Sequence, residues 1–567
     1  MDTNPKEKNK FYPLGRFRRG TVWLVLFLFS CALIGRLVWI QILYPDTLIK
    51  EGNARIVRNY HFEPARGLIT DRFGKILAIS VPVKTVDADP KLMHESGIVR
   101  DDTVMTEIAK ILEIDKTELY EKVKDPNRRF VHLKHYLDPK EASKLKKLCK
   151  DSLILHDSYR RYYPTGEVNA GLVGILNGEG DGVYGVEQSF NSYLSAQQTT
   201  RVAHKDSYNN IIENLATVQE GNAGGNLMLS VDDRLQSIAY AALGQAVREH
   251  RADSGSAVLI DVQTGEIVSL VNYPSFDPNN RKEFDSSNAK NRAITDIFEP
   301  GSTMKPLVAL AGLESRMVSW GEIFDTRPFV VDGKVVRDSH FMDRGNLTDI
   351  IKYSSNTGMA RISMRIGPNR VMDMLQRFGF GRKTQSGLIG ESAGRLNENR
   401  KFWAEIDKAT LGFGYGVAVT NLQLTSAYAT LAHGGEQLPV SILKLRDAPQ
   451  SEQVVSQSED RRMIAAMESV VSEGTGKKAA INRYRVAGKT GTAKIAQSGT
   501  YSDLYMATFA GFAPISKPRF AMVVVIEAPR EGGFYGGSVS GPVFSEVMAS
   551  ALQLYNVPPD RPEEENR

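Results

Sequence analysis

Ser302 and Lys305 lie three residues apart at the start of a long apolar run, and together they could form an activated nucleophile. Apolar residues from Leu307 to Leu313 fall on nearly every side of a helix, which predicts a helix buried all round. Because Pro306 has no N–H group, we expect the regular helix to start near Ser302. A helix N-terminus favours a developing anion, and Lys305 would lie on the same face, roughly 5–6 Å from Ser302.

The Ser-x-x-Lys pattern is a weak signal alone, because it occurs four times, starting at Ser143, Ser287, Ser302 and Ser441. Two later motifs single out the copy at Ser302. They are Ser354-Ser355-Asn356 and then Lys489-Thr490-Gly491-Thr492, which holds the one Lys-Thr-Gly of the chain. The three motifs in this order are typical of penicillin-recognising acyl-serine enzymes, so the sequence resembles the penicillin-binding proteins.

Acyl transfer to a serine needs a base, an oxyanion hole and a grip on the substrate. Ser302 is the candidate nucleophile, and Lys305 could take its proton only when neutral. Burial beside a second cation favours neutral lysine, and we expect Lys489 to be that cation. Ser354 is the candidate relay of a proton to the leaving amine, and Asn356 the candidate partner of a substrate amide. Which group is the acylation base stays open.

The resemblance implies further roles around the same serine. It implies an oxyanion hole formed by the backbone N–H groups of Ser302 and Thr492, where losing one donor typically costs about 3–4 kcal/mol in the transition state. It also implies that the hydroxyls of Thr490 and Thr492, on either side of Gly491, join Lys489 in holding a terminal carboxylate. Nothing in the sequence indicates a metal or a cofactor.

The N-terminal part of the chain predicts a membrane anchor. Residues 21–43 are apolar except for Arg36 and Gln41, which is long enough to span the ~30 Å hydrocarbon core at about 1.5 Å per residue. Residues 1–20 are basic, so we expect the N-terminus inside and the rest of the chain outside. A cleaved signal peptide is the alternative. It is disfavoured because the run is long and lacks an Ala-x-Ala-like site.

Composition places the chain among globular proteins. Its 567 residues suggest three or four domains, and 42% hydrophobic with 24% charged residues indicates neither disorder nor a polytopic membrane protein. A net charge of +5 over this length is too small to argue for nucleic-acid binding. The two cysteines, Cys31 and Cys149, make no disulfide framework.

Residues 44–225 predict a compact α/β domain, with helical spacing over 103–124 and 139–149. His132-x-x-His135 could indicate a metal pair, but no Cys or carboxylate cluster near it in the sequence completes a site, so a structural strand pair is favoured. A glycine-rich stretch ends this domain near residue 225.

Residues 226–556 predict an antiparallel sheet covered by helices. The expected elements are a helix over 233–249, a hairpin of 255–261 with 266–272, strands over 484–492, 505–512 and 520–527, and a last helix over 541–555. Residues 557–567 are rich in Pro and Glu and predict a disordered tail.

The resemblance is most specific to class B penicillin-binding proteins, and within them to the division-specific (septal) D,D-transpeptidase. Residues 298–306 and 535–544 carry this similarity, with Gly541 where Ala is expected. The implied fold is an α/β multidomain protein: a single transmembrane helix, an α/β non-catalytic pedestal in place of a glycosyltransferase, and a penicillin-binding transpeptidase domain.

By this resemblance the substrate is the D-Ala-D-Ala end of a peptidoglycan stem peptide, carried on strands or on a lipid-linked precursor, and β-lactams would trap Ser302. The implied partners are a septal membrane glycosyltransferase and other division proteins. The implied location is the inner membrane at the division septum, with a periplasmic catalytic domain. No nucleic-acid partner is expected.

Several alternatives remain beside this interpretation. Gly390-Glu-Ser392-Ala-Gly394 with Asp407 and His433 could mark an α/β-hydrolase, but no buried strand precedes the serine. A β-lactamase is disfavoured by the anchor and the pedestal. A D,D-carboxypeptidase differs only in using water as acceptor, and a penicillin-binding sensor or scaffold would bind without turnover.

Overall fold

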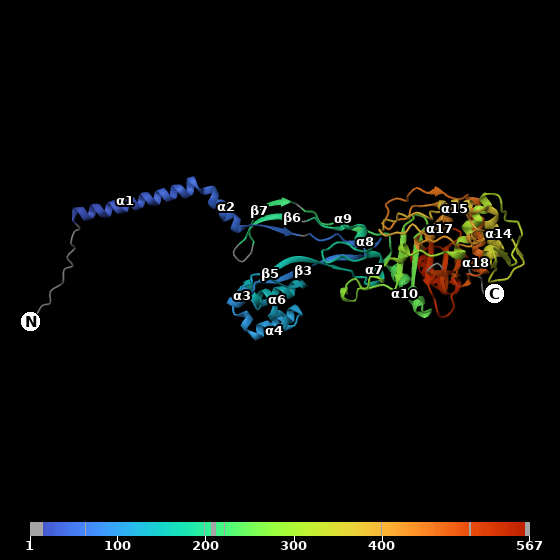
Figure 1. The fold of residues 1–567 in the computed structure, drawn as a ribbon, viewed down its shortest axis with the longest axis horizontal. Coiled ribbons are helices and arrows are strands. Elements are labelled where there is room, and N and C mark those ends of the chain that lie inside the picture. Colours follow the sequence, from blue (N-terminus) through green and yellow to red (C-terminus); the bar gives the residue numbers. More distant parts are fainter. Residues whose placement is uncertain are drawn as a thin grey trace, which may run out of the picture. The chain divides into compact units, whose positions relative to one another are not determined.

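The structure is a computed structural model that describes residues 15–62, 64–197, 199–205, 211–219, 221–397, 400–497 and 500–561 (Figure 1). The chain divides into two compact units. The first comprises Met1–Pro64, Val83–Ser158 and Gln197–Asn222, and the second comprises Ala65–Pro82, Tyr159–Ala196 and Ala223–Arg567. All three chemical motifs therefore belong to the second unit.

The first unit begins with a long apolar helix, drawn in dark blue in Figure 1. Helix α1 (Arg16–Val38) continues through a π-helical turn (Trp39–Leu43), and α2 (Pro45–Ile56) follows. Within the described part of the chain, Arg16–Leu43 is the one helix long and apolar enough to cross a membrane, and none of its side chains is buried. The predicted N-terminal apolar helix is confirmed.

As far as it is described, the rest of the first unit combines two groups of paired strands with four α-helices. Strands β1 (Val57–Phe62), β6 (Thr199–Lys205) and β7 (Ile211–Gln219) form one sheet. In the second group, residues 84–88 of β3 (Ile76–Ala88) pair antiparallel with β4 (Val131–Leu137), and β5 (Leu153–Tyr162) also pairs with β3. The helices are α3 (Pro90–Glu95), α4 (Asp102–Leu112), α5 (Lys116–Val123) and α6 (Pro139–Cys149). The predicted helical stretch 103–124 is thus two helices, because Glu113 turns left-handed and Asp115 caps α5.

The second unit is built on a five-stranded antiparallel sheet. Its strand order is β10 (Ile267–Tyr273), β9 (Ser254–Asp261), β19 (Phe520–Glu527), β18 (Thr500–Ala513) and β17 (Ala487–Gln497). The predicted hairpin and the three later strands are confirmed, although β17 and β18 extend further as one long hairpin. Strand β17 lies at the edge of this sheet.

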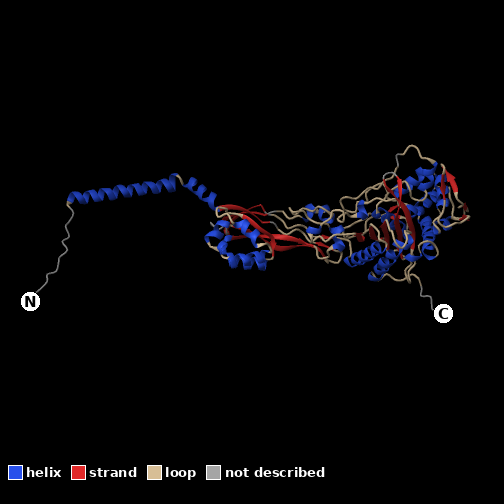
Figure 2. Ribbon diagram, turned by 60° about the horizontal axis from the view of Figure 1, so that its bottom comes forward, coloured by secondary structure: helices blue, strands red, loops and turns tan. Residues whose placement is uncertain are grey.

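Helices cover both faces of the sheet (Figure 2). One face packs against α10 (Asp233–Glu249) and α19 (Gly536–Leu554), and the other against α12 (Lys305–Glu314) and α17 (Asn421–Ala432). The last helix begins five residues before its predicted start, with Pro542 inside it at the loss of one backbone hydrogen bond. The predicted antiparallel sheet flanked by helices is confirmed.

The remaining elements of the second unit are short or surround this core. They are β2 (Ile69–Thr70), α7 (Glu167–Val173), α8 (Gly185–Ser189), α9 (Asn191–Leu194), β8 (Leu227–Met228), α11 (Arg292–Thr295), β11 (Phe324–Asp325), β12 (Phe329–Val331), β13 (Lys334–Val336), β14 (Arg344–Gly345), α13 (Leu347–Lys352), α14 (Asn356–Ile366), α15 (Pro368–Arg377), α16 (Glu405–Leu411), β15 (Glu436–Gln437), β16 (Glu452–Gln453) and α18 (Gln457–Ser472).

The C-terminal segment is attached to the second unit as far as it is described. Asp560 accepts hydrogen bonds from the backbone N–H groups of Arg485 (2.7 Å) and Ser516 (3.0 Å). The remainder of the predicted tail, residues 562–567, lies outside the described residues.

Candidate active site

Ser302 lies in a 3₁₀ turn, Gly301–Met304, directly before α12. The regular helix begins at Lys305 rather than near Ser302. Pro306 has no N–H to donate to the Ser302 carbonyl, and this carbonyl instead accepts from the Lys305 N–H. Residues three apart in a 3₁₀ turn lie on the same side, so Ser302 and Lys305 face the same way. From Lys305 to Leu313 every residue is buried, as predicted.

The three motifs meet at the hydroxyl of Ser354. The Nζ of Lys305 donates to the Ser354 carbonyl (2.6 Å) and contacts its Oγ (3.1 Å). It also donates to Asn356 Oδ1 (2.7 Å). From the edge strand β17, Lys489 Nζ donates to the same Ser354 Oγ (2.8 Å). Segments from three distant parts of the sequence thus place two amines on one serine hydroxyl.

Ser354 occupies the corner between α13 and α14 in a strained conformation. Its φ of +60° is left-handed, which costs a residue other than glycine on the order of 1–3 kcal/mol. Ser355 caps α14 by accepting the Gly358 N–H, so Asn356 is the first helical residue. The cap and the corner fix the directions of Ser354 and Asn356.

Asp338 is a supporting residue that the sequence analysis missed. Its carboxylate accepts the backbone N–H groups of Asn356 (2.5 Å) and Thr357 (2.8 Å). It also accepts the hydroxyls of Ser355 (2.6 Å) and Thr357 (2.7 Å). Four hydrogen bonds to one carboxylate hold the start of α14. Asp338 lies in a loop after β13, where no local periodicity marks it.

Burial changes the protonation of both lysines. Burial and the positive charge of Lys489 hold the pKa of Lys305 well below the ordinary lysine value, and Asp338 acts in the opposite direction. Burial lowers the pKa of Lys489 to about 7. Both side chains are fully buried. The lowered pKa of Lys305 agrees with the expectation from the sequence, and a neutral amine beside a serine is able to accept its proton.

Gly491 lets β17 approach the nucleophile turn. A Cβ atom there would lie 2.9 Å from Thr303 Cγ2 and 3.0 Å from the Pro300 carbonyl oxygen, which is too close for an unshifted structure. The threonines on either side of Gly491 already have partners: the Thr490 and Thr475 hydroxyls are 2.9 Å apart, and Thr492 Oγ1 accepts the Gly536 N–H (3.1 Å). Because Thr492 accepts in that bond, its own proton remains able to donate.

The glycine-rich segment before α17 supports the nucleophile turn from another side. Gly301 N–H donates to the Gly414 carbonyl (3.3 Å), and Gly416 N–H donates to Glu299 Oε1 (2.8 Å). A Cβ atom at Gly414 would lie 2.1 Å from the Gly301 carbonyl oxygen. Glycine is therefore required at position 414 because the two backbones approach closely there, whereas the sequence alone indicated only a turn.

The competing motifs do not assemble into sites. The Ser392 hydroxyl accepts from the Gly394 N–H (3.2 Å), whereas the His433 ring contacts the Glu436 carbonyl (3.3 Å). The ring centroids of His132 and His135 lie 3.8 Å apart with the ring planes tilted by 33°, and His132 contacts Asp87. Among the described residues there is no group of three or more His, Cys, Asp or Glu side chains arranged to hold a metal.

Two protein-family models match the chain. The model described as penicillin binding protein transpeptidase domain matches residues 255–549, and the one described as penicillin-binding protein dimerisation domain matches residues 61–229. The chain belongs to the penicillin-binding protein transpeptidase family. The resemblance inferred from the three motifs is thereby confirmed, and the order of a dimerisation domain before a transpeptidase domain agrees with the predicted architecture.

Curated relatives of this penicillin-binding protein match it over nearly its whole length. Peptidoglycan D,D-transpeptidase FtsI of Escherichia coli K12 is 41% identical over 531 residues, which cover 93% of this chain and 90% of FtsI. Probable peptidoglycan D,D-transpeptidase PenA of Neisseria gonorrhoeae is 34% identical over 566 residues, which cover 98% and 96% of the two chains.

Solved structures of penicillin-binding proteins share its fold. Penicillin binding protein 3 from Mycobacterium tuberculosis, complexed with aztreonam, matches with a TM-score of 0.68 and 25% identity, covering 89% of this chain and 99% of that one. The transpeptidase domain of Burkholderia pseudomallei penicillin-binding protein 3 matches with a TM-score of 0.54 and 39% identity, covering 59% and 98%.

Proposed function

We propose that this penicillin-binding protein is a peptidoglycan D,D-transpeptidase that cross-links stem peptides through an acyl-enzyme at Ser302. The observation that carries the proposal is the meeting of Lys305 and Lys489 at the Ser354 hydroxyl, next to the turn that bears Ser302. Relatives that match the chain nearly end to end carry the same activity in their names.

In the proposed first step, Ser302 Oγ attacks the carbonyl carbon of the penultimate D-Ala, and neutral Lys305 takes the serine proton. The backbone N–H groups of Ser302 and Thr492 stabilise the negative charge on the carbonyl oxygen. Ser354, whose hydroxyl is hydrogen-bonded to the amines of Lys305 and Lys489, passes a proton to the leaving D-Ala amine. The carbonyl–nitrogen bond breaks, and an ester to Ser302 remains.

The substrate grip and the second step use the other predicted residues. Asn356 hydrogen-bonds a backbone amide of the stem peptide. Lys489, with the hydroxyls of Thr490 and Thr492 on either side of Gly491, holds the terminal carboxylate. An amine of a neighbouring stem peptide then attacks the ester, forms the cross-link and frees Ser302. A β-lactam that mimics D-Ala-D-Ala would acylate the same oxygen.

The proposed location rests on the membrane anchor, and the proposed partners rest on the resemblance to FtsI. The basic N-terminal residues support an N-terminus in the cytoplasm, and the catalytic unit then faces the periplasm, where cell wall lies. We further propose action at the division septum with a membrane glycosyltransferase and other division proteins, because the chain resembles FtsI over 93% of its length. The boundaries 44–225 for the pedestal and 226–556 for the transpeptidase domain stay predictions.

The test is a product analysis with the full-length protein in detergent. A stem pentapeptide ending in D-Ala-D-Ala is incubated with an amine acceptor, and products are separated by mass. We expect cross-linked peptide with release of one D-Ala per cross-link, and none from Ser302→Ala protein that keeps its melting temperature. Hydrolysed peptide without cross-link would identify a carboxypeptidase and contradict the proposal.

A further inference from the structure

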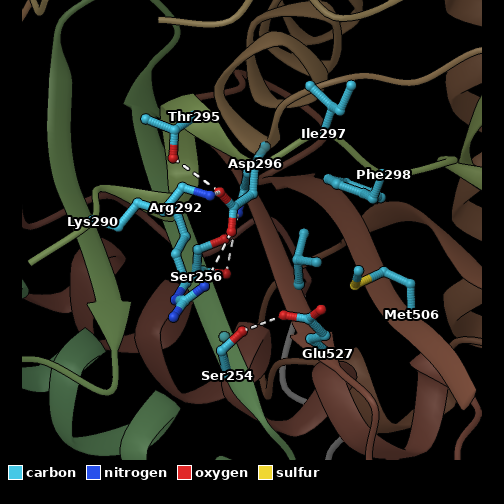
Figure 3. A pocket seen from close by; sticks show the side chains of 13 residues that line it. Ser254, Ser256, Lys290, Arg292, Thr295, Asp296, Ile297, Phe298, Met506 and Glu527 are labelled. Carbon is cyan, nitrogen blue, oxygen red and sulfur yellow. Dashed lines mark hydrogen bonds and ion pairs between the residues drawn. The ribbon is translucent and has the colours of Figure 1, made fainter. Parts of the chain in front are cut away.

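A cavity of about 300 Å³ lies at one end of the five-stranded sheet of the second unit (Figure 3). Its walls come from the first residues of β9, the last residues of β19, Met506 of β18, residues 290–298, and Asn421 at the start of α17. None of the described residues that line it is a candidate catalytic residue. The proposed acyl transfer makes no use of this cavity.

One wall of the cavity is positive. Lys290 and Arg292 both form ion pairs with the carboxylate of Asp296, the latter at 3.2 Å. Two cations share one anion, so this wall keeps a net charge of one positive unit. The Arg292 guanidinium also donates to the Ser287 carbonyl (3.3 Å), and its Nε–H alone has no hydrogen-bond partner among the described residues.

Another wall is negative. Glu527 Oε2 accepts a hydrogen bond from the buried hydroxyl of Ser254 (2.6 Å), which orients the carboxylate. Within the described part of the chain no Lys, Arg or His forms an ion pair with Glu527. Figure 3 shows Glu527 with Ser254 on one side and Lys290 with Arg292 on another. Opposite charges therefore border the cavity from different sides.

The remaining lining is partly apolar. Phe298, Ile297, Met506 and Val525 also line the cavity, and Figure 3 shows the first three on the side of the view away from Lys290. Such a surface suits a short aliphatic chain, whereas two unlike charged walls suit a ligand that is charged at both ends. The volume is at the lower limit of ligand pockets and fits an amino acid or the end of a peptide side chain.

We propose that this cavity binds a small zwitterion, with its ammonium group on Glu527 and its carboxylate on Arg292 and Lys290. Charge-assisted hydrogen bonds at both ends would select it over molecules of one charge sign. Two kinds of molecule carry this pair of charges: a free amino acid, and the amino-acid end of a cell-wall stem peptide. The second source rests on the proposed function, and the first does not.

Calorimetric titration of full-length Ser302→Ala protein in detergent tests the site without acyl transfer. The probe is meso-diaminopimelate, and its analogues without amines (pimelate) or without carboxylates (cadaverine) are the matched controls. We expect one site per chain, with pimelate and cadaverine at least about tenfold weaker, because each loses the charge-assisted contacts at one wall. A stem tripeptide ending in diaminopimelate distinguishes the sources: tighter binding than the free amino acid indicates the stem peptide, and weaker or equal binding indicates the free amino acid.

Substitutions locate the binding. Glu527→Gln and Arg292→Met should each weaken diaminopimelate at least about tenfold, whereas Arg292→Lys, which keeps the charge, and the exposed control Glu546→Gln should bind as the parent does. Melting temperatures show that the variants are folded. Absence of saturable binding, or equal affinity of the Glu527→Gln and Glu546→Gln proteins, would overturn the proposal. The readout is binding, so neither result depends on the outcome of the transpeptidase assay.

Discussion

Lys305 and Lys489 are two buried amines that share one hydroxyl partner, and a charge on either one disfavours a charge on the other. Fully buried lysine ammonium groups are costly, so the site favours the neutral form of at least one of them. A neutral Lys305 is what removal of the Ser302 proton requires. The dependence of acylation on pH is therefore the residue-level test of this arrangement.

We expect the second-order rate constant for acylation by a penicillin to rise with pH, at a midpoint well below the ordinary lysine pKa of 10.5. Lys489→Gln removes a neighbouring positive charge, so the pKa of Lys305 and the midpoint should move to higher pH, with a lower plateau from the lost carboxylate grip. Stopped-flow acylation between pH 5 and 10 measures the midpoint and the plateau of each pH profile. Lys494→Gln, on the same strand, is the control and should keep the midpoint; an unchanged midpoint in Lys489→Gln would contradict the account.

Asp460 in α18 gives a second residue-level prediction. It is fully buried, neither carboxyl oxygen has a partner among the described residues, and burial raises its pKa to about 8. The folded protein thus keeps a proton that the unfolded chain releases above its ordinary value of 3.8. This contribution to stability is present at low pH and is lost as pH rises toward 8.

Asp460→Asn cannot ionise, so its stability relative to the parent should increase between pH 5 and pH 8, by on the order of 3–4 kcal/mol. Urea unfolding of the second unit at pH 5 and at pH 8 measures the free energy of unfolding of Asp460→Asn relative to the parent. The exposed control Asp447→Asn should show no such change. A pH-independent difference between Asp460→Asn and the parent would show that the carboxyl is not held protonated.

At the scale of elements, function depends on how closely β17 lies against the turn of Ser302. Gly491→Ala places a methyl group 2.9–3.0 Å from Thr303 and Pro300, so the strand or the turn must shift. Because a small misplacement of reacting groups is costly, we expect acylation to fall on the order of 100-fold while the fold is kept. Penicillin acylation rates and melting temperatures of the purified variants measure both.

Gly541→Ala is the matched control in α19. A Cβ atom there would have its nearest contact at 3.4 Å, an ordinary van der Waals distance, and alanine is favoured over glycine inside a helix by up to about 1 kcal/mol. This variant should acylate like the parent and melt at the same or a slightly higher temperature. Equal acylation by the Gly491→Ala and Gly541→Ala proteins would contradict the steric argument.

Elements with strong local signals could be predicted from the sequence, and contacts between distant segments could not. Helix α10 has its predicted bounds because Asp232 caps it and its apolar periodicity is regular. The 3₁₀ turn at Ser302 was not predicted. It forms because Pro306 has no N–H to donate to the Ser302 carbonyl, four residues earlier, so the α-helical hydrogen bond is missing there. Asp338 was missed because only the folded chain brings its loop to the start of α14.

At the scale of the whole molecule, the chain divides into two compact units: the first includes the apolar helix, and only the second contains the motifs. No side chain of α1 is buried within the described protein, so this helix contributes no core packing, which agrees with the predicted membrane anchor. The predicted transmembrane helix and the antiparallel catalytic sheet both follow from hydrophobic patterns that are local in sequence. In contrast, these local patterns do not predict that residues 65–82 and 159–196 belong to the second unit.

Deletion of residues 1–43 should therefore move the protein from the membrane pellet to the soluble fraction while penicillin acylation continues at the rate of the full chain. Fractionation after a carbonate wash, with acylation measured on both fractions, tests this. The full-length protein is the control and should stay in the pellet. A truncated protein that remains in the washed pellet would show that another segment holds it to the membrane.

The residue that carries a penicillin adduct shows directly whether Ser302 is the nucleophile. After exposure of the full-length protein to a penicillin, tryptic peptide 293–316 should carry the mass of the drug, and fragment ions should place it on Ser302 rather than on Thr303 or Ser315. An unmodified peptide 293–316, with the drug bound elsewhere or absent, would contradict the account.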